Sequence, residues 1–162
     1  MNIYQTILEL EEKNRNVYRD LAQKCESNEG IRYILNMLAN EQDKHIEVLS
    51  SLKGGTCSGI RSTTVFQEAR KLFEGLQSDQ KTFSCSLDQV QLYRDALDLV
   101  NKKLKLYSAM IDETECEPDR KTLSEIIEEE RQQVIVLENI ILMVSRPESW
   151  LEDAEFSHLD EY

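Results

Sequence analysis

Hydrophobic side chains recur at three- and four-residue intervals along four long stretches of the chain, at about residues 3–25, 29–52, 87–114 and 118–144. Such intervals place these side chains on one face of an α-helix. Proline and glycine interrupt helices, and only two prolines and five glycines occur among the 162 residues. The pattern therefore predicts an all-α protein built from four long amphipathic helices.

The connections between these stretches predict how the helices are arranged. Short turns near residues 26–28 and 115–117 join the first helix to the second and the third to the fourth, and short turns make antiparallel neighbours. The connection over residues 53–86 begins with a Lys-Gly-Gly helix stop and has helical periodicity over residues 64–76. We predict a four-helix bundle of two hairpins. The long crossover carries a short extra helix and makes the second and third long helices parallel.

An internal repeat supports this arrangement. LEEKNRNVY (10–18) reads beside LVNKKLKLY (99–107), and LANEQDKHIEVL (38–49) reads beside IIEEERQQVIVL (126–137) at nearly the same spacing. Because both halves of each hairpin are repeated, the sequence predicts two related hairpins that face each other across a pseudo-two-fold axis.

Length and charge narrow the class of protein. The chain has the size of one domain, with the bundle over residues 1–146 and a tail, 147–162, expected to form a short helix anchored by Trp150 and Phe156. The net charge of −12 argues against a nucleic-acid partner, which requires a basic face. No run approaches about 18 apolar residues, and the N-terminus lacks a signal-peptide pattern. We therefore expect a cytoplasmic protein with no membrane partner.

The cysteine pattern excludes one class of metal module. The four cysteines, Cys25, Cys57, Cys85 and Cys116, form no CxxC pair, so a rubredoxin or zinc-ribbon module is absent from this sequence and free thiols are expected. Cys25 and Cys116 end the first and third long helices, and we therefore expect them at the same end of the bundle.

Polar residues interrupt the apolar faces of the predicted helices at five positions: Glu11, Gln42, His45, Glu130 and Gln133. Burying such groups without partners is costly, so they indicate either a metal site or a hydrogen-bonded network. A dinuclear iron or manganese site in a helical bundle takes one glutamate from each of two helices and Glu-x-x-His from each of the other two. The three-residue spacing places the glutamate and the histidine on one helical face, and both ligand types suit iron.

At these residues the chain resembles the ferritin-like superfamily, in particular its single-domain rubrerythrin-type proteins. LELEEKNRNVYRDLA and LANEQDKHIEVL look like the first hairpin of that family, and YRDALDLVNKKLKLYSAM and IIEEERQQVIVLENII look like the second. The ending RPESWLEDAEFSHLDEY resembles the tail of its single-domain members. The resemblance covers nearly the whole chain. It implies a ferritin-like bundle, a homodimer, and a role linked to iron or oxidative-stress handling.

Carried over position by position, the resemblance implies that half of the family's di-iron ligands remain. The matching positions are Glu11, His45 and Glu130. Gln42 stands where a glutamate is expected, and Gln133 stands where a histidine is expected. Val100 stands where a further glutamate is expected and offers no ligand atom. A full di-iron centre is therefore not expected.

Three functions remain open from the sequence. The first is a binding or structural protein in which the polar residues form a buried hydrogen-bonded network. The second is a single Fe, Zn or Mn ion held by the three remaining ligands, with Glu41, Gln42 and Gln133 as further candidate donors. The third is a di-iron oxidoreductase, of the peroxide-reductase or ferroxidase type, with substituted ligands. It would need an external electron donor, because the chain has no rubredoxin module.

The ligand spacing leads to a test. Replacing Val100→Glu, Gln42→Glu and Gln133→His restores the family's ligand types, and is expected from the sequence to create a di-iron site. Iron uptake and an oxo-bridged absorption band in the near ultraviolet measure the outcome. A folded triple variant that takes up no more iron than its parent would contradict the expectation.

Overall fold

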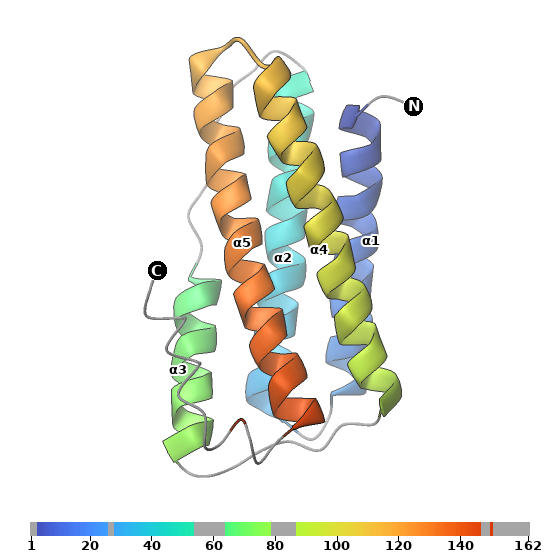
Figure 1. Cartoon of the computed structure of the whole chain (residues 1–162), viewed down its shortest axis with the longest axis vertical. Coiled ribbons are helices and arrows are strands. Elements are labelled where there is room, and N and C mark those ends of the chain that lie inside the picture. The colour runs from blue at the N-terminus through green and yellow to red at the C-terminus, as the bar shows by residue number, and fades with distance from the viewer. Residues whose placement is uncertain (1–2, 26–27, 54–63, 79–86, 147–149, 151–162) are drawn as a thin grey trace.

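The structure, a computed structural model, describes residues 3–25, 28–53, 64–78, 87–146 and 150. This part of the chain forms helices and contains no strand, which confirms the predicted all-α class (Figure 1). The helices are α1 (Ile3–Lys24), α2 (Glu29–Lys53), α3 (Val65–Ser78), α4 (Leu87–Glu113) and α5 (Glu117–Ser145). The predicted bounds of the four long helices agree with these bounds to within one residue at each end.

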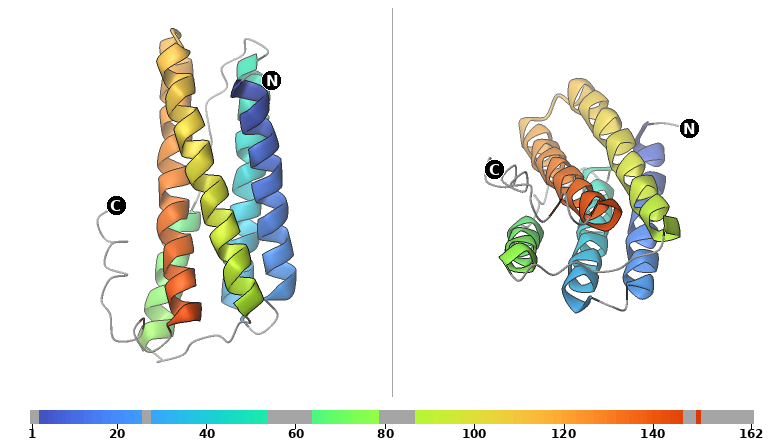
Figure 2. Two further views of the ribbon diagram at one scale, coloured as in Figure 1. Left: turned by 45° about the vertical axis from the view of Figure 1, so that its right-hand side comes forward. Right: turned by 60° about the horizontal axis from the view of Figure 1, so that its bottom comes forward.

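The axes of the four long helices are roughly aligned, and the helices form a bundle (Figure 1). α1 packs chiefly against α2, and α4 packs chiefly against α5, as expected for two hairpins. α1 also packs against α4, which joins the hairpins. α2 and α4 run in the same direction, and α3 lies outside the bundle beside α2 and α5 (Figures 1 and 2). The predicted crossover helix is therefore present, and its bounds are Val65–Ser78.

Local hydrogen bonds explain where two of the helices begin. The side-chain Oδ1 of Asn28 accepts a hydrogen bond of 3.0 Å from the backbone N–H of Ile31, which is the capping interaction typical of a helix N-terminus. α5 begins with proline in its first turn, where a missing N–H costs nothing. Arg120 of that turn donates from Nη1 to the carbonyls of Ile111 and Thr114, at 2.7 and 3.0 Å. The end of α4 is thereby tied to the start of α5.

The apolar core consists of two clusters separated by a polar layer. One cluster surrounds Leu38, Phe73 and Leu137 near the α1–α2 turn, and the other surrounds Leu49 and Ile126 near the α4–α5 turn. Along each long helix, a group of buried polar residues lies between the segments that supply these two clusters. They include Glu11, Gln42, His45, Lys103, Glu130 and Gln133. The bundle therefore places its candidate chemistry at mid-height, sealed by hydrocarbon above and below.

α3 approaches the bundle closely through one glycine. A Cβ atom added to Gly30 of α2 would lie 2.5 Å from Cδ1 of Leu72 in α3, so the absence of a side chain permits this contact. Phe73 of α3 is fully buried, and its ring meets that of Trp150 edge-on, with the centroids 6.3 Å apart. Trp150 is thus an anchor, as predicted, whereas Phe156 and the predicted tail helix lie outside the described residues.

The expected position of the cysteines is wrong. Cys25 follows α1 at the end of the bundle that holds the α1–α2 turn, whereas Cys116 lies in the α4–α5 turn at the opposite end (Figure 1). The reason is that α1 and α4 run in opposite directions. Both thiols are free, with Cys25 buried and Cys116 exposed. Cys57 and Cys85 lie outside the described residues.

The described helices also bear on the expectation about membranes. None of them combines the length and the apolar character that a membrane-spanning helix requires.

The Gly30 contact leads to a test of how α3 is attached. Gly30→Val is expected to destabilise the protein by about 1–3 kcal/mol, because the new side chain overlaps Leu72 and must displace it. Gly75→Val is the matched control, since no atom lies within 4 Å of a Cβ atom added to this helical glycine. Urea unfolding measures both free energies. Equal effects of the two substitutions would contradict the close packing of α3 on α2.

Candidate metal centre

Three predicted ligands meet in the polar layer. Glu11 of α1, His45 of α2 and Glu130 of α5 are fully buried, and each offers a ligand atom within 4.8 Å of the other two. Nδ1 of His45 lies 3.1 Å from Oε1 of Glu130 and 3.5 Å from Oε1 of Glu11. The structure therefore brings together the residues that the sequence analysis singled out, as a group that could hold a single metal ion.

A lysine that the sequence analysis missed lies among them. Nζ of Lys103 donates to Oε1 of Glu130 at 2.9 Å and to Oε1 of Gln42 at 2.7 Å, and it lies 3.5 Å from Oε2 of Glu11. The side chain is fully buried. A fixed positive charge thus contacts both carboxylates that were expected to bind a metal.

The signal for Lys103 was present in the sequence. It lies three residues after Val100 and four before Tyr107, both of which are buried on the same face of α4. In the internal repeat it aligns with Asn14, which is also buried. Because lysine is usually exposed, the residue type alone favours the solvated side of the helix.

The pKa values of the acids follow from this arrangement. Burial alone would raise the pKa of Glu11, but the charges of Lys103 and His45 lower it to about 2. Burial raises the pKa of Glu130, and Lys103 offsets that effect only in part, since the Glu11 carboxylate acts in the same direction as burial. Glu11 is therefore the stronger acid of this pair.

The histidine is charged for a related reason. Burial would lower the pKa of His45, but Glu11 and the hydrogen bonds to three carboxylates raise it well above its usual value. One imidazolium and one ammonium therefore balance the negative charge of the centre. Protein groups supply the positive charge that a metal ion would otherwise supply.

The glutamines that replace expected ligands are used in hydrogen bonds. Nε2 of Gln42 donates to the backbone carbonyl of Leu38 at 2.9 Å, while its oxygen accepts from Lys103. Oε1 of Gln133 accepts from the Tyr18 hydroxyl at 2.7 Å, and its Nε2 donates to Oε1 of Glu41 at 2.6 Å. Both amides use their ability to donate and accept at once.

The two repeat-equivalent tyrosines have different partners. The hydroxyl of Tyr107 donates to Oε1 of Glu11 at 2.7 Å, whereas that of Tyr18 donates to Gln133. Burial, reinforced by nearby carboxylates, raises both tyrosine pKa values well above the usual value. Both hydroxyls are therefore neutral donors that orient the groups they contact.

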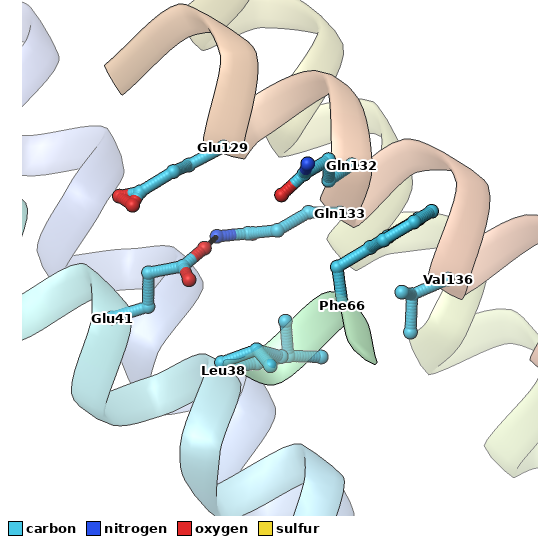
Figure 3. Close-up of a pocket in the computed structure, with 8 residues that line it drawn as sticks. Leu38, Glu41, Phe66, Glu129, Gln132, Gln133 and Val136 are labelled. Atoms are coloured by element: carbon cyan, nitrogen blue, oxygen red, sulfur yellow. Dashed lines mark hydrogen bonds between the residues drawn. The ribbon is translucent and has the colours of Figure 1, made fainter. Parts of the chain in front are cut away.

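A second group of acids lies on the other side of the imidazole. Nε2 of His45 is 3.2 Å from Oε1 of Glu129, and these two residues and Glu41 offer ligand atoms within 4.8 Å of one another. The Glu41 and Glu129 carboxylates lie between α2 and α5, in a pocket that Phe66 of α3 also lines (Figure 3). The sequence analysis included Glu41 among the candidate donors but missed Glu129, which lies within a run of three glutamates.

Neither a protein-family model, nor a curated protein, nor a solved structure matches this chain. The relationship to the rubrerythrin family therefore stays a prediction from the sequence.

The buried charges lead to a double-mutant cycle. Lys103→Met is expected to destabilise the protein by about 3–5 kcal/mol, because it leaves buried carboxylates without their cation. Adding Glu130→Gln removes one of those acids, so the double variant is expected to lose less than the sum of the single losses by about 1 kcal/mol or more.

Urea unfolding at neutral pH with a chelator present measures each free energy. Lys102→Met is the matched control, since Lys102 is the exposed neighbour on the same helix and its loss is expected to change stability by less than about 0.5 kcal/mol. Additive losses, or equal effects at the two lysines, would contradict the coupling.

Proposed function

We propose that this chain is a ferritin-like bundle protein that works without a di-iron centre, as a non-catalytic binding or structural protein. The observation that carries the proposal is the buried ammonium of Lys103, which contacts Glu130 at 2.9 Å and Glu11 at 3.5 Å. The proposal includes the homodimer that the family resemblance implies.

Electrostatics favours the ammonium over iron in this centre. Two unit charges 4 Å apart repel by about 4 kcal/mol at the effective dielectric of a protein, so a divalent ion beside the ammonium meets about 8 kcal/mol of repulsion. An incoming ion would also have to break the contacts of Lys103 with Glu130 and Gln42. A metal therefore competes against a cation that is covalently attached and already hydrogen-bonded.

The remaining positions do not compensate for this competition. Val100 is fully buried and supplies hydrocarbon where a carboxylate would be needed. Gln42 and Gln133 already donate and accept hydrogen bonds within the protein. The alternative function, a non-haem iron oxidoreductase that reduces peroxide or oxidises ferrous ion, needs two metal ions held by donors that these residues do not provide.

The ferritin-like part of the proposal is supported by topology and position. Two antiparallel hairpins with α2 parallel to α4 match the topology that the resemblance implies. The three matching ligands come from three helices and converge at mid-height, and the tyrosines paired by the internal repeat, Tyr18 and Tyr107, are both fully buried. These features are consistent with a family scaffold in which a lysine has taken over the role of the metal.

The buried ammonium of Lys103 changes the result expected of the variant that restores the family's ligand types. The triple variant with Val100→Glu, Gln42→Glu and Gln133→His keeps Lys103 and is now expected to take up no pair of irons. Adding Lys103→Ala removes the ammonium, and this quadruple variant is expected to bind two irons per chain and to develop the oxo-bridged band in the near ultraviolet.

The parent protein, loaded with ferrous ion in air, is the reference and is expected to show neither the band nor ferrous oxidation above buffer. Circular dichroism establishes that each variant is helical. An oxo-bridged band in the parent or in the triple variant would refute the role of Lys103, and so would a folded quadruple variant that binds no more iron than the triple.

A further inference from the structure

We propose that Nε2 of His45, with the carboxylates of Glu41 and Glu129, forms a separate site for one divalent transition-metal ion, best suited to Zn²⁺. This site lies between α2 and α5 on the side of the bundle that faces α3 (Figure 3). It shares only the imidazole ring with the centre that contains Lys103, and it does not depend on kinship with any family.

The two nitrogens of His45 serve different groups. Nδ1 lies 3.1 Å from Glu130 and 3.5 Å from Glu11, whereas Nε2 lies 3.2 Å from Glu129. Glu41 precedes His45 by four residues, so both side chains project from the same face of α2. One imidazole nitrogen therefore faces Glu129 and Glu41 rather than Glu11 and Glu130.

The spacing of the donors suits a small metal ion. Zinc bonds of about 2.0–2.2 Å to nitrogen and oxygen in a tetrahedron place neighbouring donors about 3.3 Å apart. The distance of 3.2 Å between Nε2 of His45 and Oε1 of Glu129 is close to that value. The third donor, from Glu41, lies within 4.8 Å of both. A modest side-chain rotation closes the set, and three protein donors leave a fourth position for water.

Supporting hydrogen bonds orient two of the three donors. The contact of His45 Nδ1 with Glu130 is the carboxylate–histidine pairing that commonly supports a metal-bound imidazole. Oε1 of Glu41 accepts from Nε2 of Gln133 at 2.6 Å, and Gln133 is itself held by the Tyr18 hydroxyl at 2.7 Å. Gln133 and Tyr18 thus help to position Glu41, and Glu130 helps to position His45.

The charge of Glu41 and Glu129 also favours a metal ion on the Nε2 side of His45. Two carboxylates offset the charge of a divalent ion, and binding displaces the Nε2 proton of His45 to solvent. Lys103 contacts Gln42 and the two carboxylates that neighbour Nδ1, and so does not occupy this position. The Glu129 side chain is 13% exposed, and it lines a pocket that Phe66 also lines.

Calorimetric titration of ZnCl₂ into the full-length, chelator-stripped protein tests the site. We expect one Zn²⁺ per chain, with affinity reduced at least about tenfold by Glu129→Gln and by Glu41→Gln. Glu128→Gln is the matched control, because Glu128 is the more exposed neighbour in the same run of glutamates and is expected to leave the affinity unchanged.

Nitrogen-15 NMR of the histidine rings identifies the donor atom without a variant that risks unfolding the core. Zn²⁺ is expected to shift Nε2 of His45 while Nδ1 keeps its proton, with His158→Gln used to assign the two rings of the chain. Absence of saturable binding would overturn the proposal. Equal loss in Glu128→Gln and Glu129→Gln, or zinc bound to Nδ1, would overturn it as well.

Discussion

The ion pairs of Lys103 with Glu11 and Glu130 are the constraint on which the rest of the polar layer depends. A buried carboxylate without a partner costs several kcal/mol, and two that face each other cost more. With the ammonium between them, Glu11 stays ionised, Glu130 accepts a short hydrogen bond, and Gln42 can complete the coordination of the lysine. His45 then contacts Glu130, and the Tyr107 hydroxyl donates to Glu11. Without the lysine, Glu11 and Glu130 would lose the ammonium that they share.

The polar layer divides the core and restricts how the helices can be aligned. A uniform apolar interior tolerates sliding of one helix past another, whereas a layer of specific donors and acceptors favours one alignment of the helices. The bonds from Tyr18 to Gln133 and from Tyr107 to Glu11 connect α1 with α5 and α4 with α1. Lys103 connects α4 with α2 and α5. Every long helix is thus held in register at mid-height.

The fold was largely predictable, because helical periodicity and loop length are local signals. Helix bounds, the crossover helix and the burial of Glu11, Gln42, His45, Glu130 and Gln133 all followed from spacing. Lys103 did not, because lysine is usually exposed, and this preference outweighs its spacing from Val100 and Tyr107. Glu129 was missed as well, because it lies in a run of three glutamates and its neighbours give no sign that it is the one beside His45. The placement of Cys25 and Cys116 at opposite ends of the bundle was also predictable, because α1 and α4 run in opposite directions in the predicted topology.

The imidazole of His45 is where the two halves of the site can act on each other. Its Nδ1 faces Glu130 and Glu11, and its Nε2 faces Glu129. A proton on Nε2 makes the ring an imidazolium with one positive charge, whereas a divalent metal bound at Nε2 brings two. The inner network holds the ring in place in both cases. A centre whose acids contact a buried lysine can therefore still orient a ligand for a metal on its other side.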